Sequence, residues 1–267
     1  MNESSSRGAT WLAALTDNVI PVAGYPASVR VVDALLADQR CRYIAVVPDE
    51  SNPYPRARTG EVGLIEGWAL AKAVHEAIES DVGTHKRTIV AVVDVSSQAY
   101  GRREEAFGIH AALAGAAGAY AKARQVGHAV IALIVGKAMS GAFLAHGYQA
   151  NRIIALNDPG VMVHALGKAA AARVTMRSVD ELERLAAEVP PMAYDIASYA
   201  TLGLLWRLLA VGSADRPSDA DVSNVRRTLA AALDNIRSDP TVDLRSRLGG
   251  ANRQASSLVR EKLLAQW

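Results

Sequence analysis

Long hydrophobic runs along the chain predict strands that are buried on both faces. Residues 88–95 and 129–135 are mostly apolar and show no alternation with polar positions. This pattern is typical of a sheet covered by helices on both sides, because neither face of such a strand meets water. With the shorter apolar runs included, the predicted strands cover residues 29–36, 42–47, 88–95, 129–135, 152–156 and 161–164.

Helical patterns fill most of the intervals between these strands. The predicted helices cover residues 62–80, 104–126 and 141–148. Strands that alternate with helices at this spacing indicate a parallel sheet with crossover helices, so we expect an α/β fold. Beyond residue 167 nearly the whole chain is expected to be helical, including the amphipathic stretches 220–237 and 254–266.

No internal repeat or low-complexity linker divides the chain. Three prolines within residues 48–60 predict a loop there rather than a domain boundary. We expect an N-terminal arm over residues 1–26 and a single domain over residues 27–267. The last part of that domain, from about residue 167, is its helical tail.

Composition restricts the possible partners. The chain has 267 residues, half of them hydrophobic, and a net charge of +2 without a dense Lys/Arg block, so no nucleic-acid partner is expected. No apolar run reaches the roughly 20 residues of a membrane span, and the N-terminus has no secretory signal pattern. The single cysteine, Cys41, excludes an internal disulfide. We therefore expect a cytoplasmic protein without membrane contact.

Several common kinds of active site are absent from the sequence. There is no GxxxxGK[ST] or GxGxxG motif for a nucleotide, and the six histidines lack metal-ligand spacing, so no metal site is expected. Ser140 lies in MSGAF rather than in a GxSxG nucleophile elbow, which favours a role at a helix start over nucleophilic attack. We expect His146 to be packed or hydrogen-bonded rather than catalytic.

Two loops remain as the candidate site. Residues 96–103 follow one buried strand and residues 136–142 follow the next. Active sites of open α/β sheets collect at such strand ends, and each loop precedes a helix whose first N–H groups are free to bind an anion. The same pattern also fits ordinary strand–helix connections, so the residues alone leave both interpretations open.

The sequences of these loops resemble a known family. SSQAYGRREE at 96–105 and GKAMSGAF at 136–143 are similar to the γ subunit of biotin-independent malonate decarboxylase. The similarity covers roughly residues 43–166. More distantly, this region resembles the C-terminal half of the acyl-CoA carboxyltransferases, in the crotonase-like superfamily. The resemblance implies a crotonase-like ββα spiral with a helical C-terminal extension.

The chain departs from the carboxyltransferase pattern at two places. Those enzymes have D-x-P-G and K-A-x-G-G-A, whereas Ser96–Ser97 and Ser140–Gly141 stand at the corresponding positions here. The close glycine pair admits the biotin ring, so a serine in it argues against biotin. We therefore expect no cofactor on this chain.

The resemblance also implies a function that this chain shares with other subunits. A β subunit would complete the active site, and an acyl-carrier subunit would present malonyl thioester on a prosthetic group derived from dephospho-CoA. An acyl-carrier transferase subunit would belong to the same complex. The products would be CO2 and the acetyl thioester, which makes the chain a carbon–carbon lyase subunit that is active only with its partner.

The resemblance suggests roles for individual residues. The backbone amides of Gly141 and Ala142 are expected to bind the carboxylate or the thioester oxygen, and Met139 and Ser140 to shape the turn. The expected facing, substrate-binding wall is formed by Ser97, Gln98, Tyr100 and Gly101. Arg56 and Arg58 could contact the carrier's phosphates or acidic surface, or they could be solvated.

Two other functions are compatible with the sequence. The chain could be the carboxyltransferase half of a biotin-dependent acyl-CoA carboxylase, which would make activity depend on biotin. It could also be a non-catalytic scaffold that orders the β subunit's site and docks the carrier.

Overall fold

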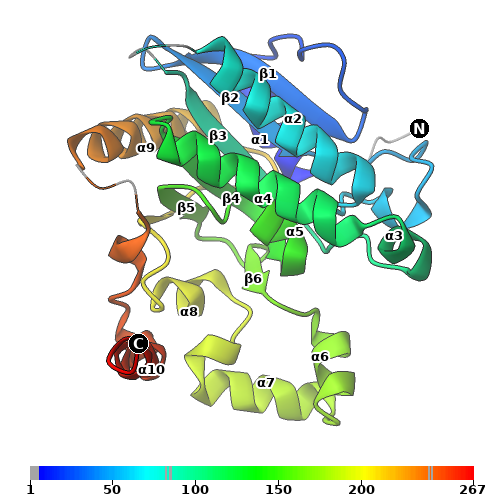
Figure 1. Cartoon of the computed structure of the whole chain (residues 1–267), viewed down its shortest axis with the longest axis vertical. Helices are drawn as coiled ribbons and strands as arrows, with labels where there is room; N and C mark the ends of the chain where they lie inside the picture. The colour runs from blue at the N-terminus through cyan, green and yellow to red at the C-terminus, as the bar shows by residue number, and fades with distance from the viewer. Residues whose placement is uncertain (1–5, 82, 84–85, 240, 242) are drawn as a thin grey trace.

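A mixed β-sheet forms the centre of the computed structural model, which describes residues 6–81, 83, 86–239, 241 and 243–267 (Figure 1). The strands lie in the order β1-β2-β3-β4-β5-β7, and β6 pairs with the end of β4. Their bounds are β1 Val29–Leu36, β2 Gln39–Val46, β3 Thr88–Val95, β4 Val130–Met139, β5 Arg152–Leu156, β6 Met162–His164 and β7 Arg207–Leu209.

The sheet is parallel except at one edge. β1 and β2 form an antiparallel hairpin, whereas every other pairing is parallel. The hairpin turn uses Ala37 and Asp38, with φ of 48° and 59°. Two positive φ values in a two-residue loop are typical of type I′ turns, whose twist matches that of the strands. The predicted parallel arrangement with crossover helices therefore holds for the rest of the sheet and does not extend to this hairpin.

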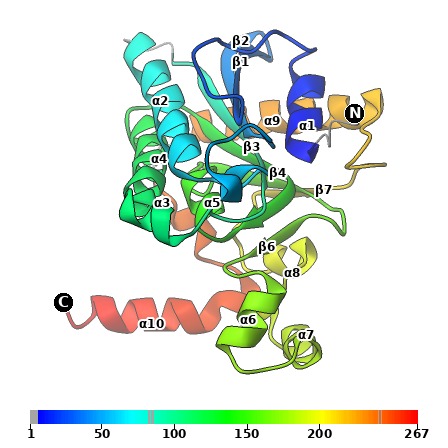
Figure 2. The same ribbon diagram turned by 90° about the vertical axis from the view of Figure 1, so that its right-hand side faces the viewer.

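Helices cover both faces of the sheet, as the buried strands predicted. α2 (Leu64–Ser80) and α4 (Ile109–Gln125) lie on one face, and α1 (Arg7–Leu15) and α9 (Asp219–Ser238) lie on the other (Figures 1 and 2). The helices α2 and α4 approach each other closely at Gly67, where an added Cβ would lie only 2.8 Å from the carbonyl carbon of Ala112. Small residues therefore set the distance between these two helices.

The predicted helix over residues 104–126 is two helices. α3 (Arg102–Ala106) ends before Gly108, and α4 begins at Ile109. Gly108 has a φ of 83°, a left-handed conformation that terminates helices and that glycine adopts at little cost. The break turns the chain between the loop after β3 and the long helix α4.

Strand β4 is longer than predicted. We expected it to end at residue 135, with a sharp turn through Gly136, but it continues to Met139 because Lys137, Ala138 and Met139 pair with β6. Gly136 is needed inside this strand, since a Cβ there would collide with the Asp94 carboxylate. The helix α5 (Ser140–Ala145) then starts directly at the strand end.

The tail is largely helical, with one exception. Its helices below the sheet in Figure 1 are α6 (Lys168–Val174), α7 (Val179–Glu188), α8 (Ile196–Ala200) and α10 (Gln254–Leu264). Short 3-10 turns of the tail lie at Pro190–Met192, Arg245–Arg247 and Ala251–Arg253, and another lies before α2 at Pro55–Ala57. The helical prediction was wrong at β7, which pairs with β5. A short apolar run can form either element, and the free edge of β5 decides in favour of a strand here.

The helix α1 lies within the predicted N-terminal arm and packs on the domain. Trp11 is fully buried, and its indole N–H donates to the carbonyl of Ala214 at 2.8 Å. Arg7 forms ion pairs with Asp158 at 2.7 Å and Asp215 at 2.6 Å. Residues 1–5 of the arm lie outside the described residues, and a boundary at residue 26 stays a prediction.

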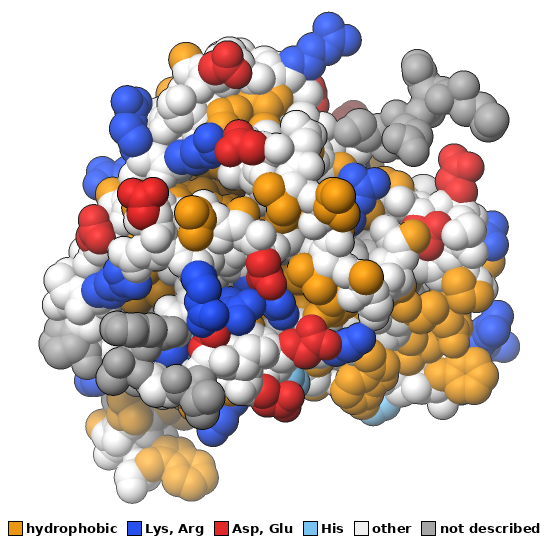
Figure 3. All heavy atoms as spheres, turned by 90° about the horizontal axis from the view of Figure 1, so that it is seen from above, with side chains coloured by type: hydrophobic (Ala, Val, Ile, Leu, Met, Phe, Trp, Pro, Cys, Tyr) orange, Lys and Arg blue, Asp and Glu red, His pale blue; other side chains and the backbone are white. Residues whose placement is uncertain are grey.

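The surface carries charges of both signs. Seen from above, Lys and Arg side chains are interspersed with Asp and Glu, and one broad hydrophobic area lies at the lower right (Figure 3). Among the described helices, none is long and apolar enough to cross a membrane.

Candidate active site

The two predicted loops meet at the ends of β3 and β4. Val95 pairs with Ala138, so the residues that follow each strand lie next to each other. The backbone N–H of Gly141 donates to Oε1 of Gln98 at 2.7 Å. This hydrogen bond joins one predicted amide donor to one residue of the predicted facing wall.

The loop after β3 is held in place by main-chain hydrogen bonds. The N–H of Val62 donates to the carbonyl of Ser97 at 3.1 Å, and the N–H of Ala99 donates back to Val62 at 2.9 Å. Ala99 is buried beneath the loop. Gln98 therefore extends toward Gly141 from a fixed backbone.

Ser140 has an unusual backbone conformation. Its φ is 58°, in the left-handed region that non-glycine residues rarely adopt. Such a conformation costs on the order of 1–3 kcal/mol and is found most often at functional sites. Met139, the residue before it, is buried in a small cluster with Ala171, Leu182 and Tyr194. The turn is thus strained at Ser140 and anchored by Met139 to the helical tail.

A cavity of about 440 Å³ lies beside this turn and has a largely apolar lining. One wall is the end of β4 and the start of α5, and the other comes from β6 and the tail. The lining residues are Ala138, Ser140, Gly141, Phe143, Leu144, Tyr148, Val163, His164, Ala165, Pro191, Ala193, Tyr199, Leu202 and Leu204. The cavity therefore brings the predicted turn together with residues up to 64 positions further along the chain.

Two polar residues of this cavity were not found from the sequence. Tyr199 is buried, its hydroxyl has no hydrogen-bond partner among the described residues, and burial raises its pKa. The His164 ring stacks on Tyr194 with centroids 3.9 Å apart, and burial lowers the pKa of His164. No sequence signal identified Tyr199, because only the folded tail brings it to the strand ends.

None of the four predicted wall residues lines this cavity, and Gln98 reaches it only through its hydrogen bond with the Gly141 N–H. Tyr100 is 54% exposed, and its hydroxyl donates to Glu105 at 3.1 Å. Gly101 is buried close to Arg56 and Glu104, and the hydroxyl of Ser97 donates to the carbonyl of Gln98 at 3.0 Å. Their contact with substrate stays a prediction, as do the roles of Gly141, Ala142, Ser140 and Met139.

Arg58 has a partner within its own loop. Its Nε donates to the carbonyl of Asn52 at 2.9 Å, so the guanidinium stiffens the Pro-rich loop.

The buried histidine near the site has a structural role, as expected. Nε2 of His146 lies 3.1 Å from the carbonyl of Val92, and Nδ1 lies 3.0 Å from the hydroxyl of Tyr120. A carbonyl only accepts, so Nε2 carries the proton and Nδ1 accepts from the tyrosine. Burial lowers the pKa of His146 to about 4, which keeps the ring neutral. Within the described part of the chain, no group of three or more His, Cys, Asp or Glu could hold a metal ion.

Distant relatives confirm the fold. The structure is similar to transcarboxylase 12S, with a TM-score of 0.65 and 19% identity over 87% of this chain and 42% of that one. The predicted α/β, carboxyltransferase-like fold of the crotonase type is therefore correct.

Two closer relatives cover 98% of this chain. A Pseudomonas malonate decarboxylase hetero-tetramer solved in complex with coenzyme A contains a chain with 64% identity and a TM-score of 0.94, over 98% of this chain and all of that one. A Pseudomonas MdcD-MdcE hetero-dimer contains a chain with 62% identity and a TM-score of 0.90, over the same shares.

A curated relative has a different activity in its name. The malonyl-S-ACP:biotin-protein carboxyltransferase MADD of Malonomonas rubra is 31% identical over 87% of this chain and 80% of its own length. The family model of the malonate decarboxylase gamma subunit, MdcE, matches residues 57–267. The chain belongs to the malonate decarboxylase gamma subunit family.

Proposed function

We propose that this chain and an MdcD-type beta subunit form a decarboxylase with a shared active site. Its substrate is a malonyl thioester on the prosthetic arm of an acyl-carrier subunit, and its products are CO2 and the acetyl thioester. An acyl-carrier transferase subunit belongs to the same complex. The main support is the apolar cavity of about 440 Å³ with the Ser140–Gly141 turn in its wall. The Pseudomonas relatives, which assemble as a hetero-dimer and a hetero-tetramer, support the partner.

The reaction needs charge stabilisation more than it needs a base. The bond between the carboxylate carbon and the α-carbon breaks, CO2 leaves, and the electron pair delocalises onto the thioester oxygen as an enolate. A proton then adds to the α-carbon. A single backbone N–H directed at a developing oxyanion contributes roughly 3–4 kcal/mol. The apolar lining adds to this effect, because it favours neutral CO2 over the carboxylate.

Gln98 controls access to the Gly141 amide in this proposal. Its Oε1 accepts that N–H at 2.7 Å, so an anion that binds there must displace the carboxamide. Rotation of the side chain would turn its NH2 group toward the same anion. Gln98 therefore satisfies the amide between turnovers and supplies a second donor when substrate is bound.

We further propose that the reaction does not use biotin. The Cβ of Ser140 sits on a left-handed residue at the turn, where the carboxyltransferase pattern has glycine. That Cβ takes up space beside the amides. The biotin-dependent alternative, suggested by the relative MADD, predicts that avidin inhibits the complex. We expect activity to be insensitive to avidin.

We place the complex in the cytoplasm. The only cysteine of this chain, Cys41, is buried, so the chain has no internal disulfide that would need an oxidising compartment. Cell fractionation with an antibody to the chain tests this location.

The deciding experiment uses the co-expressed complex with a malonyl-loaded carrier and measures CO2 release. Gly141→Val should abolish turnover, since even a Cβ at Gly141 would lie 3.0 Å from Oε1 of Gln98. Gly118→Val is the matched control, because an added Cβ at Gly118 meets no atom within 4 Å. Full activity of Gly141→Val in an intact complex would favour the scaffold function instead.

A further inference from the structure

A second cavity, of about 700 Å³, lies at the amino ends of the parallel strands, opposite the candidate active site. Its lining includes Arg87 just before β3, His128 just before β4 and Asn151 just before β5. The candidate active site lies where β3 and β4 end, so the length of these strands separates the two cavities. The two cavities share no lining residue, so the proposed decarboxylation uses no side chain of this second cavity.

Cationic side chains dominate the lining of this cavity. They are Arg40, Lys86, Arg87, Arg124 and Arg237, against the single carboxylate of Asp239. Two of these cations already have a carboxylate partner. Arg40 and Arg87 both pair with Asp81, which is fully buried, and Asp239 pairs with Arg152 at 2.8 Å.

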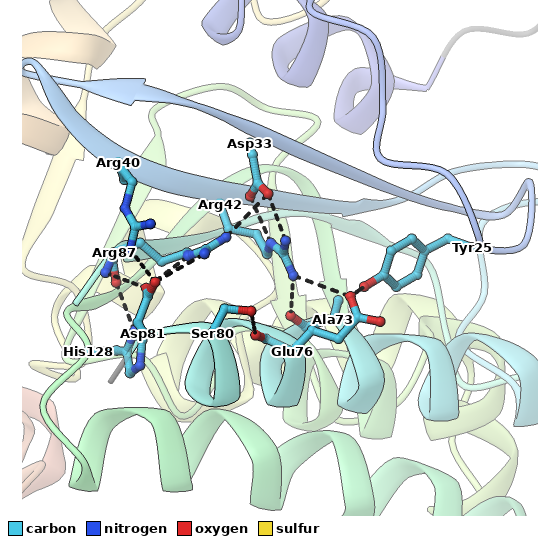
Figure 4. Close-up of polar contacts among 10 residues, drawn as sticks. All are labelled: Tyr25, Asp33, Arg40, Arg42, Ala73, Glu76, Ser80, Asp81, Arg87 and His128. Carbon is cyan, nitrogen blue, oxygen red and sulfur yellow. Dashed lines mark hydrogen bonds and ion pairs between the residues drawn. The ribbon is translucent and has the colours of Figure 1, made fainter. Parts of the chain in front are cut away.

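Two cations remain without a counter-charge. Among the described residues, no carboxylate forms an ion pair with Lys86 or with Arg237. Figure 4 shows how the neighbouring charges are used: Arg40, Asp81, Arg87 and His128 converge at one end of the network. The uncompensated positive charge in the cavity therefore comes from Lys86 and Arg237, which lie outside this network.

His128 adds an unsatisfied polar atom to the same cavity. The ring is 2% exposed, and Nδ1 donates to the carbonyl of Arg87 at 2.9 Å. Nε2 is buried and has no hydrogen-bond partner among the described residues. Buried polar atoms nearly always have a partner. When protonated, Nε2 is a hydrogen-bond donor. An anion can accept that hydrogen bond and is also attracted by the Lys and Arg side chains of the lining.

We propose that this cavity binds a phosphate-type anion between Lys86, Arg237 and the protonated Nε2 of His128. Burial lowers the pKa of His128, and the positive charge of Lys86 lowers it further. A bound anion opposes both effects, so binding takes up a proton. The charged groups around the ring are Arg40 on β2, Lys86 and Arg87 before β3, Asp81 after α2, Arg124 on α4, and Arg237 and Asp239 at the end of α9.

The first test is calorimetric titration of the purified gamma–beta complex with inorganic diphosphate. We expect saturable binding that Lys86→Gln combined with Arg237→Gln weakens by about tenfold or more. The matched control, Arg260→Gln combined with Lys262→Gln, removes the same charge from the exposed helix α10 and should leave the affinity unchanged. No saturable binding, or an equal loss in both double variants, overturns the proposal.

The second test examines His128 directly. Sulfate stays dianionic between about pH 6 and pH 8, the range in which histidine titrates. Its affinity should rise as the pH falls, and NMR titration of the unmodified complex should show that saturating sulfate raises the pKa of His128. An unchanged pKa overturns the role of His128, and this measurement does not depend on a variant that folds.

The phosphate has two sources to distinguish, a free metabolite or the prosthetic arm of a carrier. Titration with the carrier, with and without its arm, separates them. Binding that requires the arm and is displaced by diphosphate supports the carrier, and binding of diphosphate alone supports a free metabolite.

Discussion

Replacing Gln98 by glutamate separates the stability of the turn from its catalytic role. The two side chains have the same shape, so the new carboxylate can accept the Gly141 N–H that Oε1 of Gln98 now accepts at 2.7 Å. A charged acceptor makes that hydrogen bond stronger. The same charge repels any anion that approaches this amide, so we expect a folded and assembled complex with low activity.

The size of the loss follows from the geometry. A substrate anion bound at the Gly141 amide would lie within about 4 Å of the new carboxylate, and two like charges at that distance repel by about 4 kcal/mol at an effective dielectric constant near 20. Gln98 is half-buried, so solvent screening reduces this to about 2–4 kcal/mol. The expected loss in kcat/KM is therefore about thirtyfold to a thousandfold.

The assay measures CO2 release by the gamma–beta complex across a range of malonyl-carrier concentrations. Gln125→Glu is the matched control, because it adds the same charge at an exposed position near the end of α4. Thermal unfolding of each complex provides the stability readout. A Gln98→Glu complex with kcat/KM within about threefold of the unmodified one would refute anion binding at Gly141.

Two further predictions concern the fold. Gly67→Ala should lower the free energy of unfolding in urea by about 1–3 kcal/mol, because the new Cβ would lie 2.8 Å from the carbonyl carbon of Ala112. Gly118→Ala, on the open side of α4, should raise the free energy of unfolding by up to about 1 kcal/mol. Equal effects of the two substitutions would contradict tight packing between α2 and α4. Burial lowers the pKa of His146 to about 4, below the value near 6.5 in an unfolded chain. As the pH drops, the unfolded state therefore binds a proton before the folded state does. The free energy of unfolding should fall between about pH 6.5 and pH 4. An NMR-measured pKa near 6.5 for this ring would contradict its burial as a neutral group.

Three strands were predicted with the correct bounds, including β1, which lies at the edge of the sheet and is partly exposed. The predicted ranges 29–36, 88–95 and 152–156 coincide with β1, β3 and β5. The end of β4 could not be predicted, because a glycine such as Gly136 is typical of a turn. Only the pairing with β6 keeps the residues after Gly136 in the strand. β7 was missed for the same reason, since only the free edge of β5 makes its short apolar run a strand.

The candidate site shows the same limit. The sequence identified Gln98 and Gly141, which the structure joins by a hydrogen bond, because both directly follow buried strands. It did not identify Tyr199, or the contact of Met139 with the tail cluster. Both depend on how the helical tail folds back on the sheet, and no local pattern records that contact.

The cavity beside Ser140 has walls of two different origins. One wall belongs to the sheet, and the other, with Pro191, Tyr199 and Leu202, belongs to the tail. The pocket therefore exists only when the tail is docked on the sheet, and Tyr199 in the tail wall also belongs to the main hydrophobic core. Substitutions in the tail wall, such as at Pro191, are expected to change which acyl group is accepted while the Gly141 amide stays the same. Differences in substrate selectivity between members of the family are therefore expected in the tail wall of the cavity.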